Sequence, residues 1–158
     1  GWSVAVDGDT AIIGAPHDSF PLTGNHGSAY VFVRTGSTWA MQTKILAPDL
    51  AASDEFGIAV ALSGETAIIG AQGDNAAQGS ASVFVRSGTT WSRQAHLTAA
   101  SGAPNDNFGA AVAISGDTVV VGAPFDTVGA TIAQGSAHIF ARSGTAWTQQ
   151  AQLTASDG

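Results

Sequence analysis

The feature that most constrains the fold is an internal repeat that covers the whole chain of 158 residues. Its three copies start at Gly1, Gly57 and Gly109. In each copy a Gly-Ser pair is followed by a tryptophan, 12 residues after the glycine. Only the segment before this pair varies in length: the glycine that ends the second apolar segment and the glycine of the pair are 13, 9 and 13 residues apart in the three copies. A tandem repeat of this size indicates supersecondary units that bury their apolar faces against one another. We therefore expect three such units, at 1–56, 57–108 and 109–158.

Each copy is predicted to form four antiparallel strands and no helix. Its apolar segments are short, rich in Val, Ile and Ala, and bounded by glycine turns. In copy one, Asp7-Gly8 predicts the first hairpin turn. The second segment of every copy is apolar on both faces and is expected to be buried on both sides, at 11–14, 67–70 and 119–122. The third strand ends at an arginine and the fourth begins at the tryptophan.

Four strands repeated in tandem at this period are typical of a β-propeller blade. The predicted fold is therefore all-β, with three blades. Propellers close with roughly four to eight blades, so three blades need further blades of the same protein or of another copy. The last copy stops six residues before the next expected glycine, and Gly1 has no preceding Phe. We interpret this pattern as a fragment of a longer repeat protein.

Composition excludes several classes of function. Twelve acidic against five basic residues give a net charge of −7, which argues against nucleic acid as a partner. The absence of cysteine excludes a disulfide framework, thiol catalysis and Cys-ligated zinc. No apolar run reaches the roughly 18 residues of a membrane span. Low Lys content and many Gly, Ser, Thr and Ala residues suit a secreted or cell-surface protein, in an extracellular bacterial setting.

Two short motifs recur at the start of the copies and after their second strands. Their members are Phe56-Gly57, Phe108-Gly109, Gly14-Ala15-Pro16 and Gly122-Ala123-Pro124. With their spacing, they resemble the FG-GAP repeat, the blade unit of the integrin α-subunit propeller and of many bacterial secreted proteins. The middle copy departs from the motif with Gly70-Ala71-Gln72. The resemblance implies a propeller that serves in adhesion receptors, accessory domains of enzymes or large surface proteins. Integrin-type blades bind calcium through Asp-x-Asp-x-Asp-Gly, a string that this sequence lacks, so the resemblance assigns no calcium site.

Acidic residues gather at one predicted edge of the sheets. Antiparallel pairing brings the loops between strands 2 and 3 and between strands 4 and 1 to the same edge. We call this the loop edge. Its segments carry eight acids and no Lys or Arg: Asp18, Asp49, Asp54, Glu55, Asp74, Asp106, Asp126 and Asp157. The opposite, turn edge carries four acids and the three arginines that end the third strands: Asp7, Asp9, Glu65, Asp117, Arg34, Arg86 and Arg142.

Five of these acids recur between copies and are the candidate binding residues. Asp18, Asp74 and Asp126 each lie four residues after the glycine of the second motif, and Asp54 and Asp106 lie two before the Phe. One interpretation makes them turn residues that accept backbone N–H groups. The other makes the loops, above all at Asp18, Asp74 and Asp126, a site for a hard cation such as Ca²⁺, which binds six to eight oxygens. No other cofactor is expected.

The remaining candidates have structural alternatives. His17, Asp18 and His26 share one loop, which leaves a single metal site open. Three tryptophans recur, at Trp39, Trp91 and Trp147. They could stack on sugars, but we favour the alternative that they fill the space between neighbouring blades. The arginines are expected to pair with turn carboxylates or carbonyls. No Gly-x-Ser-x-Gly elbow supports a nucleophilic serine.

These observations favour a non-catalytic extracellular binding or adhesion module that presents acidic loops to a protein, glycan or cation. Two alternatives stay open. The blades of separate chains could associate to close a ring or form a polymer, since an open end blade exposes an apolar face. The chain could also be the accessory propeller of a larger secreted enzyme.

Overall fold

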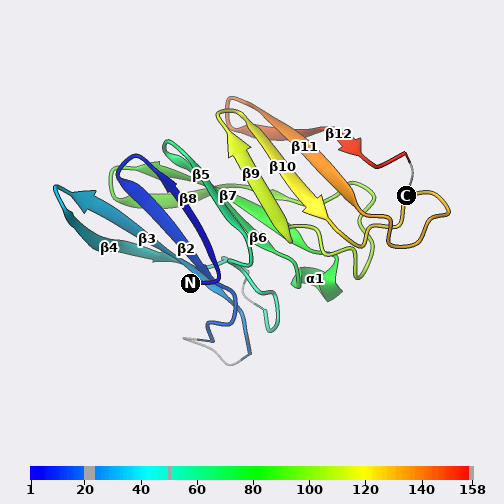
Figure 1. Ribbon diagram of the computed structural model, residues 1–158, viewed down its shortest axis with the longest axis horizontal. Coiled ribbons are helices and arrows are strands. Elements are labelled where there is room, and N and C mark those ends of the chain that lie inside the picture. Colours follow the sequence, from blue (N-terminus) through cyan, green and yellow to red (C-terminus); the bar gives the residue numbers. More distant parts are fainter. Residues whose placement is uncertain (20–23, 50, 157–158) are drawn as a thin grey trace.

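The computed structural model describes residues 1–19, 24–49 and 51–156 and contains three four-stranded antiparallel sheets placed side by side (Figure 1). We call them blades 1, 2 and 3. Blade 1 contains β1 (Ser3–Asp7), β2 (Thr10–Ala15), β3 (Ser28–Thr35) and β4 (Thr38–Ile45). Blade 2 contains β5 (Val60–Ser63), β6 (Thr66–Ala71), β7 (Ser80–Ser87) and β8 (Thr90–Leu97). Blade 3 contains β9 (Ala111–Ser115), β10 (Thr118–Ala123), β11 (Ser136–Ser143) and β12 (Ala146–Leu153). The predicted all-β class and the three blades are confirmed.

Within each blade the strands pair in chain order, so every connection joins neighbouring strands. The first hairpin turn lies one residue later than predicted, because Asp7 pairs with Thr10 and leaves Gly8 and Asp9 in the turn. Gly8 has a φ of +55° there, a conformation that favours glycine. The predicted burial of the second strands on both sides is confirmed for β6, which is buried along its whole length. It is wrong for β2 and β10, which are only partly buried because each belongs to an end blade.

The prediction of no helix is wrong for one short segment. Helix α1 (Asp74–Ala77) lies in the shortest of the three loops between second and third strands. It is not a regular helix, since Asn75 and Ala76 have positive φ values of 49° and 59°. This tight left-handed turn lies in the loop whose flanking glycines, Gly70 and Gly79, are nine residues apart, whereas the equivalent glycines of the other blades are thirteen apart. None of the helical segments in the described ranges has the length and apolar character needed to span a membrane.

Neighbouring blades pack through two apolar clusters, one at each interface. Between blades 1 and 2, Ile12 and Val31 of blade 1 are buried with Val60 and Ile69 of blade 2. Between blades 2 and 3, the matching positions form the same arrangement: Ile68, Val83, Val112 and Val121. Each blade therefore has one face for the preceding blade and another for the following one.

The two sequence motifs meet at these interfaces. A Cβ added to Gly14 would lie 2.0 Å from the carbonyl oxygen of Gly57, and one added to Gly70 would lie 2.0 Å from that of Gly109. Real Cβ atoms do not approach so closely, so a glycine at this position lets the carbonyl of the glycine that starts the next copy lie against the strand. The adjoining phenylalanine is fully buried, and Phe108 packs edge-on against Phe140 with ring centroids 6.1 Å apart.

At the turn edge, the arginine and tryptophan of blades 2 and 3 each contact the preceding blade. Arg86 binds Glu65 of its own turn, lies 5.4 Å above the ring of Trp91, and donates to Thr10 of blade 1 at 3.0 Å. Trp91 donates its indole N–H to Gln42 of blade 1 at 3.1 Å. Blade 3 repeats both contacts one blade later, from Arg142 to Thr66 at 3.3 Å and from Trp147 to Gln94 at 2.8 Å. The predicted pairing of the arginines with turn carboxylates is thus confirmed, as is the packing of Trp91 and Trp147 between blades.

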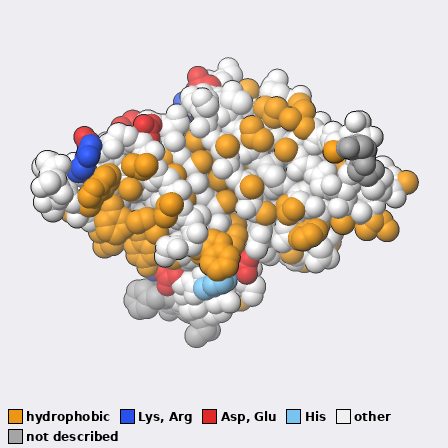
Figure 2. Space-filling view, viewed as in Figure 1, with side chains coloured by type: hydrophobic (Ala, Val, Ile, Leu, Met, Phe, Trp, Pro, Cys, Tyr) orange, Lys and Arg blue, Asp and Glu red, His pale blue; other side chains and the backbone are white. Residues whose placement is uncertain are grey.

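The outward faces of the two end blades expose apolar residues whose counterparts in other blades are at least partly buried. On blade 1, Val4, Val6 and Trp39 are 72%, 66% and 42% exposed, although their counterparts in blades 2 and 3 are partly or fully buried. Figure 2 shows hydrophobic side chains gathered over the sheet that contains β1 to β4. On blade 3, Leu153 is exposed, whereas the equivalent Leu97 is buried.

Candidate binding site at the loop edge

The loop edge is built on one attachment that all three blades share. The carbonyl of Asp18 accepts the N–H of Gly27 at 2.9 Å. Asp74 and Gly79 in blade 2, and Asp126 and Gly135 in blade 3, make the same bond at 3.0 Å. Because the loop is closed between these two residues, differences in length and sequence between them do not disturb the strands. The variable segments are therefore displayed from a fixed base.

The side chain of Asp18 is held by its own blade. One carboxylate oxygen accepts hydrogen bonds from the hydroxyls of Ser28 and Tyr30, at 2.6 and 2.8 Å, and lies 2.8 Å from the ammonium of Lys44. Burial by itself lowers the pKa of Lys44, but the bond to Asp18 raises it above its ordinary value. The carboxylate thus ties the loop to the third and fourth strands of blade 1.

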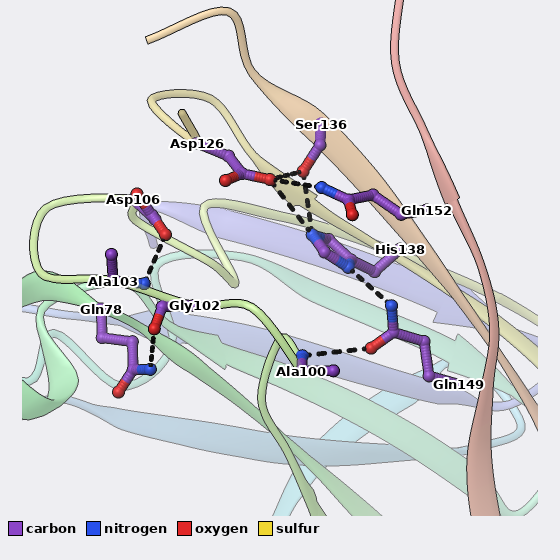
Figure 3. Close-up of polar contacts among 10 residues, drawn as sticks. All are labelled: Gln78, Ala100, Gly102, Ala103, Asp106, Asp126, Ser136, His138, Gln149 and Gln152. Carbon is purple, nitrogen blue, oxygen red and sulfur yellow. Dashed lines mark hydrogen bonds and ion pairs between the residues drawn. The ribbon is translucent and has the colours of Figure 1, made fainter. Parts of the chain in front are cut away.

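Asp126 has the same role in blade 3 with different partners (Figure 3). It accepts hydrogen bonds from Ser136 and from the amide of Gln152, the latter at 2.7 Å, and lies 3.7 Å from Nε2 of His138. His138 is wholly buried and stacks edge-on against Phe108, with ring centroids 5.3 Å apart. Burial lowers the pKa of His138 below its ordinary value of 6.5, although Asp126 opposes the shift, so the ring is neutral at pH 7.

The hydrogen bonds assign the protons in this cluster. Gln149 accepts the N–H of Ala100 at its Oε1, so its NH₂ group faces His138 and donates to Nδ1 at 3.1 Å. The imidazole proton therefore lies on Nε2, where it donates to Ser136 at 2.8 Å, and the serine in turn donates to Asp126. A serine nucleophile needs a histidine that accepts its proton. Here the histidine donates and the carboxylate lies on the same ring nitrogen as the serine, so the cluster is a structural network.

The other recurring acids differ from this pattern. Asp54 and Asp106 are buried, and their carboxylates accept the N–H groups of Ala51 and Ala103 at 2.8 and 2.6 Å. They are turn residues, as one of the two interpretations predicts, and burial raises the pKa of Asp54 although Ala51 opposes the shift. Asp74 is more accessible, with His96 Nε2 at 3.9 Å.

The structure does not bring Asp18, Asp74 and Asp126 together, because each belongs to a separate blade. Within residues 1–19, 24–49 and 51–156, no group of three or more His, Asp or Glu side chains is arranged to hold a metal ion. His17 lies against Trp2, with ring centroids 5.3 Å apart, and 4.0 Å from Glu55. Asp157 falls outside the described residues.

The loop edge is less acidic than the sequence count implied. Lys44 and Arg93 are strand residues, yet their long side chains reach Asp18 and Asp49, in the latter case at 3.1 Å. The prediction of an edge without basic groups is therefore wrong. Sequence reasoning also missed Ser136 and His138, although two residues apart in a strand place both side chains on one face. That spacing recurs as Ser28 with Tyr30 and as Ser80 with Ser82.

A cleft of about 290 Å³ opens at the loop edge of blade 1. Its walls include Gly1, Pro16, Asp18 and Tyr30. Tyr30 occupies the position of His138, against which Phe108 packs in blade 3. The cleft therefore corresponds to the place that the motif phenylalanine fills in blade 3.

Comparison with known families agrees with this geometry. The model of the FG-GAP repeat matches residues 1–32, 39–84 and 91–140. The second and third matched segments each begin in the fourth strand of one blade and end in the third strand of the next. A comparison with curated proteins finds no match. Because the matched segments cover most of the chain and the Phe-Gly and Gly-Ala-Pro residues meet at the blade interfaces, the chain belongs to the FG-GAP repeat family.

Proposed function

We propose that the chain is a non-catalytic binding module of a secreted or cell-surface protein, and that it presents its loop edge to a protein, glycan or cation ligand. The observation that carries the proposal is the shared attachment of the three loops. Identical carbonyl-to-glycine bonds fix their bases, while the segments between differ in length and sequence. A rigid scaffold with variable loops is the usual arrangement of a recognition surface.

The acids at this edge divide into two groups by accessibility. Asp18, Asp54, Asp106 and Asp126 are largely buried and hold the loops in shape. Asp49, Glu55 and Asp74 keep accessible carboxylates, with side chains 56%, 27% and 29% exposed. We assign the direct ligand contacts to this second group. Loops at regular spacing on one scaffold would strengthen a multivalent contact through avidity.

The proposal is tested by binding of the chain to an array of glycans and to polycationic peptides, with and without Ca²⁺. The variant Asp74→Asn removes an accessible loop-edge charge, and Asp117→Asn removes a charge from the turn edge as a matched control. We expect the first variant to weaken binding and the control to leave it unchanged. Equal binding by both variants would overturn the assignment to the loop edge. Calcium is tested separately by melting with Ca²⁺ and with a chelator, and an unchanged melting temperature would remove it from the proposal.

A further inference from the structure

We propose that the outward face of blade 3 binds the outward face of blade 1 of a second copy of this chain, head to tail, and that two copies close a six-bladed ring. The inference concerns the blade faces and is independent of the ligand proposed for the loop edge. The two interfaces between blades use equivalent residues. The equivalent residues on the outward faces of blades 1 and 3 contact no other blade of the described chain.

The apolar residues of the two end faces match those of the interior interfaces. The faces that meet a following blade carry alanine and branched residues at equivalent positions: Ala5 and Ile12 in blade 1, Ala61 and Ile68 in blade 2, Ala113 and Val120 in blade 3. The faces that meet a preceding blade carry larger residues: Val60 and Leu62 in blade 2, Val112 and Ile114 in blade 3, Val4 and Val6 in blade 1. Blade 3 thus exposes the first type of face and blade 1 the second.

A shallow apolar groove of about 140 Å³ lies on the outward face of blade 3. Ala113, Thr118 and Val120 are among its walls. Val4 and Val6 of blade 1 are exposed, and Figure 2 shows hydrophobic side chains gathered over that sheet. A chain with two exposed apolar faces of complementary type is expected to cover one with the other.

The polar contacts of the turn edge extend the same match. At the interior interfaces the arginine of one blade donates to a threonine of the blade before it, and the tryptophan donates to a glutamine. Thr118 and Gln150 occupy the two acceptor positions in blade 3. Arg34 and Trp39 occupy the donor positions in blade 1, where Arg34 already lies 5.6 Å above the ring of Trp39. The donors of one copy therefore have defined acceptors on the other.

The glycine contact adds a steric criterion. Gly14 and Gly70 each lie against the carbonyl of the glycine that starts the following blade. Gly122 is the third member of this series, and a Cβ added to it would meet only Ala111, at 3.4 Å. In the proposed assembly Gly122 lies against Gly1 of the second copy. Contact with Gly1 of the second copy would require glycine at position 122, whereas within the single chain an added Cβ would meet only Ala111.

Two copies are favoured because the contact is heterologous. Head-to-tail contacts form a closed ring if the rotation per copy closes, and an open filament if it does not. Two copies supply six blades, inside the range of roughly four to eight in which propellers close. Each copy of these three blades then uses both of its outward faces.

The test is sedimentation of the chain over a range of concentrations, with one variant for each face. Val4→Asp places a charge on the blade 1 face, where the side chain is exposed and the fold of the single chain does not depend on it. Gly122→Ala places a methyl group at the blade 3 face. Ile132→Asp, at a loop residue that is 84% exposed, controls for the added charge. Circular dichroism of each variant checks that it is folded.

We expect the wild-type chain and the control to sediment as two copies of 15.7 kDa each, and either face variant to weaken the association at least about tenfold. An equimolar mixture of the two face variants retains one intact contact and should form a pair that neither forms alone. Single chains at every concentration, or pairs that either face variant leaves intact, would overturn head-to-tail pairing. Long polymers would overturn ring closure.

Discussion

The substitution Gly70→Ala tests the glycine contact between blades 2 and 3. The added Cβ would lie 2.0 Å from the carbonyl oxygen of Gly109, whereas ordinary contact begins near 3.4 Å. The two backbones would therefore have to separate by about 1.4 Å (3.4 minus 2.0). Because protein interiors are close-packed, such a displacement spreads to the neighbouring contacts. The residue that adjoins Gly109 is Phe108, whose ring is buried and whose N–H donates to the carbonyl of Gln78 at 3.0 Å.

The expected cost combines three contributions. Overpacking of a tight interior costs about 1–3 kcal/mol. Weakening a buried backbone hydrogen bond adds about 1 kcal/mol. Replacing glycine by alanine restricts the unfolded chain and returns about 0.4–1 kcal/mol. The net loss in the free energy of unfolding is about 1–3.5 kcal/mol, which for a chain of this size lowers the melting temperature by roughly 2–14 °C.

Gly122→Ala is the matched control, because it is the same substitution at the same position of blade 3. Its Cβ would meet only Ala111, at ordinary contact distance. We expect a change within about 0.5 kcal/mol. Both variants are compared with wild type by urea unfolding, at a concentration at which sedimentation finds single chains. Equal losses for the two variants would refute the argument that the following blade is what requires glycine.

Three further predictions follow from the polar network, the turn edge and the cleft. Burial lowers the pKa of His138 in the folded chain, so the stability of the fold should be highest above the ordinary histidine pKa of 6.5 and should fall as the pH drops below that value. Urea unfolding midpoints measured from pH 8 to pH 5 should show this decrease. His138→Gln should flatten the profile in that range. The hydrogen bond from Arg86 lowers the pKa of Glu65, so its stabilisation is present above the ordinary value of 4.5 and is lost as the pH falls through the folded-state pKa. Since Glu65 is mostly exposed, Glu65→Gln should cost at most about 1 kcal/mol near pH 7 and nothing in strong acid, and an equal cost at both pH values would contradict the pairing. A phenylalanine added before Gly1 should fill the cleft of blade 1 and raise the free energy of unfolding by about 1–2 kcal/mol relative to an added serine, and equal melting temperatures of the two extended chains would refute the assignment of the cleft.

The fold could be predicted because each strand signal was local and appeared three times. Glycine turns, short branched segments and a fixed distance to the tryptophan mark the same strands in every copy. The turn at Gly8 was displaced by one residue because the glycine and not the preceding aspartate takes the positive φ. Helix α1 was missed because a left-handed turn at Asn75 and Ala76 has no apolar periodicity.

The loop edge was harder to predict, because contacts there depend on side chains from different strands. Counting acids by loop could not show that Lys44 extends from β4 to Asp18. The turn roles of Asp54 and Asp106 could be predicted from their position before the Phe-Gly motif, since aspartate readily accepts nearby backbone N–H groups. The partners of Asp126 could not be predicted in this way, because Ser136, His138 and Gln152 belong to two strands and only the register between those strands brings them together.

The offset between the matched family segments and the blades affects how such a chain can change in length. The second and third segments each contain the last strand of one blade and the first three strands of the next, so each spans a complete interface. A segment added or removed between two equivalent turns, such as those at Gly36 and Gly88, exchanges one interface for another of the same type. The cut falls where a Cβ would meet open space. Arrays of this repeat can therefore lengthen or shorten by whole blades without redesign of any packed surface.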